Sequence, residues 1–135
     1  MQNLIYALIQ VLHNLGAVTV VATSASALWL VRGNATVQHR LALLLAVAWA
    51  IQMASGALFG ITTFLFESHL PDIHGIAVDA LAIKVICALS GFVLAVFYPR
   101  LNPGLSRDNQ LLVWRVSFVL GVVALGSAAF LRWFS

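Results

Sequence analysis

Two ionisable residues, His13 and Lys84, each lie deep inside a long apolar stretch of this 135-residue chain. In hydrocarbon, ionisable side chains are costly, so they occur mainly where they face a bundle interior, a wet cavity or a ligand. A lysine midway along a membrane span cannot easily extend its ammonium group to the interface, so it needs a carboxylate, carbonyl groups, water or an anionic ligand. In its neutral form, the same amine could bind a metal ion beside an imidazole. The pair is the first candidate for a functional site.

A second group of possible ligands lies between the second and third apolar stretches, and comprises Glu67, His69, Asp72 and His74. Two imidazoles and two carboxylates so close in sequence could capture a borderline divalent cation such as copper or zinc. Their spacing matches no established zinc pattern and includes no thiolate, so an ordinary interfacial loop is the alternative interpretation. The predicted metal ligands are therefore His13, His69, Asp72 and His74.

The composition indicates the environment of these residues. The chain is 62% hydrophobic and 8% charged, with a mean hydropathy of +1.02, which leaves too little polar surface to cover a soluble globule. Four segments reach the roughly 20 apolar residues that a membrane-spanning helix needs. They lie near residues 4–31, 41–64, 75–98 and 111–133, and turn-forming residues separate them. The sequence predicts an all-α integral membrane protein with one domain, an antiparallel bundle of four transmembrane helices.

Arginine residues predict the orientation of this bundle. Arg32, Arg40, Arg100 and Arg107 fall at one end, whereas only Arg132 lies near a helix terminus at the other. The positive-inside rule then places the arginine-rich end in the cytoplasm and both termini outside, as in a bacterial-type inner membrane. Because topology accounts for the net charge of +3 and no basic stripe is present, nucleic acid is not expected as a partner. The expected partners are the lipid bilayer, other membrane proteins or further copies of the chain.

Depth along the predicted helices brings a third side chain to the first pair. At about 1.5 Å per residue, His13 and Lys84 lie about 13 Å below the outer helix ends, and Gln52 roughly 15–18 Å below. Lys84 also shares a helical stripe with small residues that favour close helix contact, namely Cys87, Ala88, Gly91 and Ala95. We therefore expect His13, Gln52 and Lys84 to form one cofactor-binding layer. The alternative is that His13 is a neutral residue whose hydrogen bonds only hold two helices together.

Two further interpretations concern single residues near this layer. Asp79 is the only acid inside a predicted span, but it lies about 140° around the helix from Lys84, which makes a direct ion pair awkward. Trp114 lies near a helix end and is predicted to be an interfacial anchor, as are Trp29 and Trp133. Trp49 is deeper, which favours packing or contact with a flat cofactor.

Short motifs along the chain resemble those of two membrane families. They are Leu12-His13-Asn14-Leu15-Gly16, Ser55-Gly56, Ala82-Ile83-Lys84-Val85 and Tyr98-Pro99-Arg100-Leu101-Asn102-Pro103. In this order they resemble the copper-resistance D family, although Trp114-Arg115-Val116 stands where those domains often carry an acid. The order of His and Lys is also similar to the four-helix membrane protoporphyrinogen oxidase family, which is associated with haem, but that family's basic segment after the first helix is absent. Either resemblance implies that His13 and Lys84 are site residues.

These observations support three functional hypotheses. The first is a copper-handling or metal-linked membrane protein, not expected to be an enzyme, in which the outer loop captures the ion and His13 and Lys84 form an inner site. The second is a redox protein that binds haem b, or an oxidoreductase of tetrapyrroles or quinones. A haem held by two histidines needs a partner at the depth of His13, whereas His39 and His74 lie near opposite membrane faces. The third is an accessory subunit of a larger membrane complex.

Overall fold

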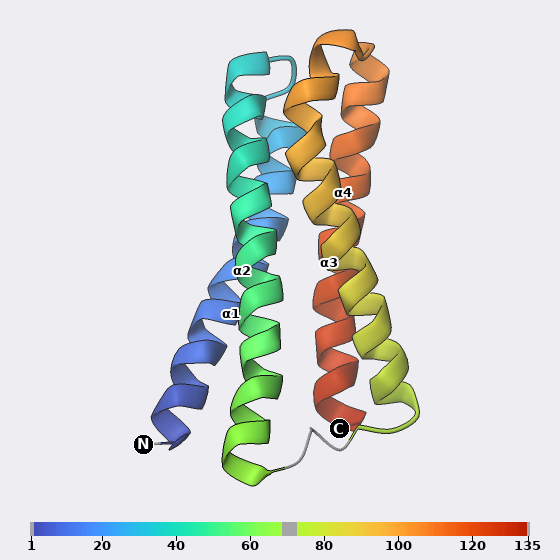
Figure 1. Cartoon of the computed structure of the whole chain (residues 1–135). Coiled ribbons are helices and arrows are strands. Elements are labelled where there is room, and N and C mark those ends of the chain that lie inside the picture. Colours follow the sequence, from blue (N-terminus) through green and yellow to red (C-terminus); the bar gives the residue numbers. More distant parts are fainter. Residues whose placement is uncertain (1, 69–72, 135) are drawn as a thin grey trace.

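The chain forms an elongated bundle of four antiparallel helices in a computed structural model that describes residues 2–68 and 73–134 (Figure 1). The elements are α1 (Gln2–Ala25), the π-helix η1 (Ser26–Leu30), α2 (Ala35–Glu67), α3 (Ile76–Leu101), the 3₁₀-helix η2 (Asn102–Gly104) and α4 (Arg107–Phe134). All four long helices are long and apolar enough to cross a membrane. No strand occurs within the two described ranges. The predicted all-α, four-helix architecture is therefore confirmed.

Two helices begin earlier than the hydropathy of the sequence predicted. α2 begins at Ala35 rather than near residue 41, because the Asn34 side chain accepts a hydrogen bond from the Val37 amide (3.1 Å) and caps the helix. α4 begins at Arg107 rather than near residue 111, where the Ser106 hydroxyl accepts from the Asn109 amide (3.3 Å). The polar first turns of both helices extend beyond the apolar spans, and hydropathy alone does not detect them.

The third helix differs from its prediction at the other end. Pro99 was expected to end it, but α3 continues to Leu101 and passes directly into η2. Pro99 lacks the N–H that would bond a carbonyl one turn earlier, so the last turn of α3 loses one hydrogen bond, while the turns before it keep theirs. Arg100, in the same turn, lies 5.9 Å from the centre of the Phe97 ring.

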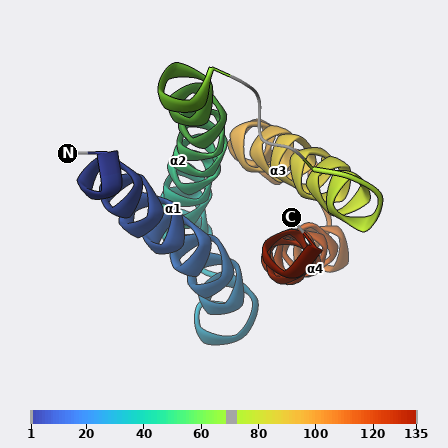
Figure 2. The ribbon, with the colours of Figure 1, turned by 90° about the horizontal axis from the view of Figure 1, so that it is seen from below.

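The helices pack in a ring in which α1 and α3 are diagonal to each other. α2 and α4 each contact both of these helices, whereas α1 and α3 do not pack along their lengths (Figure 2). The predicted small-residue stripe of α3 is buried at Cys87, Ala88, Gly91 and Ala95. Gly91 receives the ring of Trp49, since a Cβ atom built on it would lie 2.7 Å from Cζ2 of that ring. Trp49 is therefore a packing residue, as one of its two interpretations proposed.

Aromatic and amide side chains fill the core near the arginine-rich end. Trp114 is only 1% exposed and packs edge-on against Tyr98, with 5.0 Å between ring centres, so its prediction as an interfacial anchor was wrong. The Tyr98 hydroxyl donates to the side-chain oxygen of Gln38 (2.8 Å), which links α3 to α2. By contrast, Trp29 and Trp133 are exposed, as expected of residues at a membrane interface. Trp114 differs because helical rotation turns its ring toward the core.

Candidate functional site

The candidate site is centred on the imidazole of His13, which α1 presents to α2. The ring is 8% exposed, and its Nδ1 atom lies 2.7 Å from the hydroxyl oxygen of Ser55. That hydroxyl also lies 2.6 Å from the main-chain oxygen of Ile51, to which it must donate because a carbonyl only accepts. A hydroxyl has one proton, so Ser55 must accept a hydrogen bond from Nδ1–H of His13. The proton of a neutral His13 is therefore on Nδ1, and its lone pair is on Nε2.

Lys84 reaches this lone pair from the diagonal helix. Its Nζ atom lies 2.8 Å from Nε2 of His13, so the amine donates to the imidazole. Lys84, His13 and Ser55 form a hydrogen-bonded chain that joins α3, α1 and α2 at one level. If His13 carried protons on both nitrogens, Lys84 would have to be neutral to accept from it. The contact is therefore compatible with at most one positive charge on the two side chains.

Gln52 completes the layer through the main chain of His13. Its side-chain nitrogen donates to the main-chain oxygen of His13, and the side chain is 7% exposed. Gly16 makes room for it, because a Cβ atom there would lie 2.8 Å from that same nitrogen. The predicted convergence of His13, Gln52 and Lys84 is thus confirmed. That the three residues bind a cofactor stays a prediction.

The site predicted from the sequence comprised His13, Gln52 and Lys84. It did not include Ser55 or the aromatic residues beyond it, although Ser55 and Phe59 share a helical face with Gln52. The Phe59 ring meets the His13 ring edge-on, with 5.9 Å between centres and an 81° angle between planes. Tyr6 stacks against Phe59 at 6.4 Å, and its hydroxyl is 3.0 Å from the Thr63 hydroxyl. The spacing contained a signal, since Tyr6 and His13 are seven residues apart on α1, and Ser55, Phe59 and Thr63 follow at intervals of four on α2.

Charged residues that could have competed for Lys84 or His13 lie elsewhere. Asp79 is exposed, and Lys84 turns to His13 instead, in keeping with the awkward geometry expected for the pair. His39 is exposed in the early turns of α2, near the opposite end of the bundle from His74. His39 and His74 therefore lie away from His13, and neither is a second histidine beside it.

The proposed outer metal loop is described only at its edges. His69 and Asp72 lie outside the described residues, and His74 is exposed just before α3. Ten residues separate His74 from Lys84, which corresponds to about 15 Å along a helix, so His74 and His13 are not brought together. Within residues 2–68 and 73–134, no group of three or more His, Cys, Asp and Glu side chains could hold a metal ion. The metal site predicted from His13, His69, Asp72 and His74 stays a prediction.

Comparison with known proteins gives no further assignment. No protein-family model matches the chain, and no curated protein or solved structure matches it. The resemblances to the copper-resistance D and protoporphyrinogen oxidase families therefore stay predictions.

Proposed function

We propose that this chain is a copper-handling integral membrane protein in which His13 and Lys84 hold monovalent copper inside the bundle. The observation that supports the proposal is the orientation of His13, whose Nδ1–H is held by Ser55 while Nε2 faces the Lys84 amine at 2.8 Å. Metal-binding histidines commonly donate their second ring N–H to a fixed acceptor, which sets the tautomer and aims the lone pair. A buried imidazole and an amine from facing helices supply two nitrogen ligands.

The charge of the site favours monovalent copper over a divalent ion. Among residues 2–68 and 73–134, no carboxylate contacts His13 or Lys84, so this part of the chain offers only neutral or positive groups there. The desolvation penalty of an ion rises steeply with its charge. Without a carboxylate to compensate it, a divalent cation is therefore less stable inside a bilayer than monovalent copper. Imidazole nitrogen is a good copper ligand, and a metal-bound Lys84 must be neutral. Copper binding should therefore release a proton and weaken as the pH falls.

The proposed setting is a bacterial-type inner membrane, with the arginine-rich end in the cytoplasm and both termini outside. His13 and Lys84 lie about ten residues from the outer ends of their helices, so an ion would enter from that side. His74, at the same end, lies where an entering cation would first meet the protein. These assignments rest on the arginine distribution and on the order of the helices.

Copper binding by purified protein tests the proposal. Protein in detergent is titrated with monovalent copper under anaerobic conditions against a colorimetric chelator, at two pH values. We expect about one copper ion per chain, with affinity reduced at least about tenfold in His13→Gln and Lys84→Met. Ser55→Ala should lower the affinity about 10- to 100-fold, because the imidazole loses the group that orients it.

His39→Gln is the matched control, because it removes an exposed imidazole from the far end of α2 and should leave copper affinity unchanged. Circular dichroism checks that each variant keeps its helical content. Wild-type protein that binds no more copper than His13→Gln would refute the proposal. An absorption spectrum of the same preparation separates the haem alternative, because a Soret band that disappears in His13→Gln would favour haem b over copper.

A further inference from the structure

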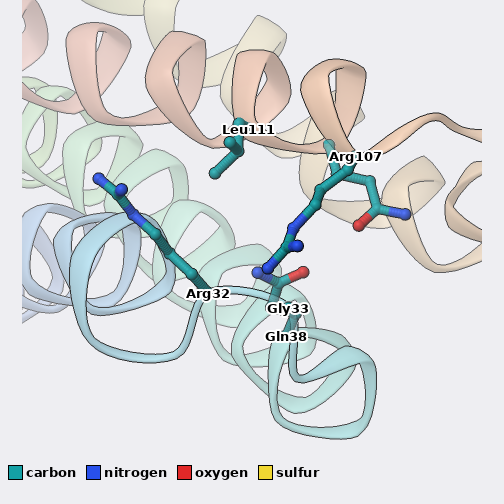
Figure 3. Close-up of a pocket in the computed structure, with 6 residues that line it drawn as sticks. Arg32, Gly33, Gln38, Arg107 and Leu111 are labelled. Carbon is teal, nitrogen blue, oxygen red and sulfur yellow. The ribbon is translucent and has the colours of Figure 1, made fainter.

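A pocket of about 240 Å³ lies at the arginine-rich end of the bundle, away from the His13 site. It is lined by Arg32, Gly33, Gln38, Arg107, Gln110 and Leu111. Figure 3 shows Arg107 extending from α4 toward Gly33 and Gln38, while the side chain of Arg32 begins beside Gly33 and runs away from the Arg107 guanidinium along the pocket. The volume exceeds the roughly 30 Å³ that one water occupies in the liquid, so a small polar group fits.

The two arginines give the pocket an uncompensated positive charge. Arg32 uses its Nε atom to donate to the main-chain oxygen of Leu28 (2.5 Å), which leaves its terminal nitrogens available. Within residues 2–68 and 73–134, no carboxylate forms an ion pair with Arg32 or Arg107. Asp108 is the only acid in the chain outside residues 67–79, and its side chain is exposed. Two arginine side chains therefore line one pocket, and no carboxylate of the described residues is paired with either.

The groups around the two arginines leave the guanidinium groups as the part of the pocket that can bind an anion. Gly33 has a φ angle of +79°, and a Cβ atom there would lie 3.0 Å from a terminal nitrogen of Arg107, so glycine allows the guanidinium to approach. Gln38 is buried and engaged by Tyr98 and Val31, with its amide nitrogen 3.4 Å from the Val31 oxygen. Gln110 donates to main-chain oxygens of η2 and the segment after it. Both glutamine amides thus form hydrogen bonds within the protein, and the two arginines remain available to bind an anion.

We propose that this pocket binds an anionic phosphate group at the membrane–water interface. Arginine matches the geometry of a phosphate through paired N–H donors, and does so better than lysine. The pocket lies where the apolar spans of η1 and α4 give way to polar connections, which is the depth of lipid headgroups. Basic pockets between membrane helices on the cytoplasmic side are typical sites for anionic lipid headgroups. The phosphate belongs either to such a lipid or to a soluble phosphate compound.

Binding measured with two separate probes tests this site and identifies the source. Protein is placed in nanodiscs of phosphatidylcholine with increasing phosphatidylglycerol, or in neutral detergent with inorganic phosphate, and thermal unfolding is followed. We expect a stabilisation that saturates and an apparent affinity about fivefold lower in Arg32→Gln or Arg107→Gln, which corresponds to about 1 kcal/mol per arginine. Arg100→Gln is the control, because it removes the same charge from the same end without lining the pocket.

Saturable stabilisation by phosphatidylglycerol alone supports the site with a lipid as its source. The same effect with inorganic phosphate supports the site with a soluble phosphate as its source. An effect that is absent with both probes, or that Arg100→Gln reduces as much as Arg107→Gln, overturns the proposal, because the charge of the whole end would then account for it. None of these outcomes depends on copper binding at His13.

Discussion

The hydroxyl of Ser55 fixes the chemistry of His13 because it has a single proton to give. That proton goes to the Ile51 carbonyl, so the imidazole must place its own proton on Nδ1 and its lone pair toward Lys84. In membrane helices, serine hydroxyls commonly donate a hydrogen bond to the main-chain carbonyl four residues earlier. Here the same bond orients a histidine on the neighbouring helix, and so an uncharged residue controls the ionisable pair.

Replacement of Lys84 by methionine tests what the lysine contributes to the fold. The variant removes a buried ionisable group, and it leaves the Nε2 atom of His13 without a donor, a loss of about 1–3 kcal/mol. Relief from burying a charge offsets this loss. We therefore expect Lys84→Met to change the free energy of unfolding by no more than about 1 kcal/mol or to raise it.

Reversible unfolding in mixed micelles measures this change. Ile83→Met, at the neighbouring exposed position, is the control for the introduced side chain. A loss of about 3–5 kcal/mol in Lys84→Met alone would contradict the expectation and would make the lysine one half of a structural pair.

The residues of the layer could be predicted, and the role of each could not. His13, Gln52 and Lys84 stood out because polar groups are rare in apolar segments and because helical rise puts them at one depth. Which atom of His13 meets which neighbour depends on the rotation of α1 against α2, and no single-sequence pattern fixes that rotation. Ser55 was noted only as part of the Ser55-Gly56 motif. Its role toward His13 was not predicted, since serines without a ligand role are common in membrane helices.

Helix contacts in this bundle are set by where small residues meet large ones. The Trp49 ring of α2 lies against Gly91 of α3, and the main chain of α3 can approach only because no Cβ atom intervenes. Gly60 of α2 has no such role, since a Cβ atom on it would meet nothing within 4 Å. Glycine therefore allows close helix contact at position 91 and makes no such contact at position 60.

Substitution of Gly91 by alanine should destabilise the α2–α3 contact. The added methyl group overlaps the Trp49 ring, and overpacking of this kind costs about 1–3 kcal/mol. Gly60→Ala is the matched control, and there we expect no loss or a gain of up to about 1 kcal/mol from helix propensity. Unfolding in mixed micelles compares the two, and equal effects would show that Trp49 does not press on Gly91 as described.

Helix bounds illustrate what composition predicts about elements. The four spans were found because they are apolar, while the first turns of α2 and α4 were missed because Thr36, Gln38, Asp108 and Asn109 are polar. Capping by Asn34 and Ser106 extends these helices beyond their apolar spans. The burial of Trp114 was missed in the same way, because distance from a helix end does not tell which side of the helix faces the core.

Across the whole molecule, charge separates the two ends of the bundle. The connections at residues 31–34 and 102–106 lie at one end with most of the arginines, and both termini lie at the other (Figure 1). Positive residues beside membrane helices oppose translocation, so this distribution predicts an orientation. Hydropathy and charge are both properties of the sequence, which explains why the overall architecture was predicted more completely than the site.

Thiol labelling of intact cells tests the predicted orientation. Cysteines are introduced singly at Ser106 and at His74, which lie at opposite ends, in a Cys87→Ser background. We expect an impermeant reagent to label position 74 in intact cells and position 106 only after the membrane is opened, because the arginine-rich end stays inside. The reverse pattern would contradict the orientation, and with it the proposed route of copper entry.

The contact between Lys84 and His13 spans the diagonal of the ring, where the two backbones do not pack. A guest that takes the imidazole lone pair also removes the bond that holds this diagonal. A ligand bound between the two nitrogens therefore replaces the direct hydrogen bond between α1 and α3. The size of that ligand then sets the distance between these two helices.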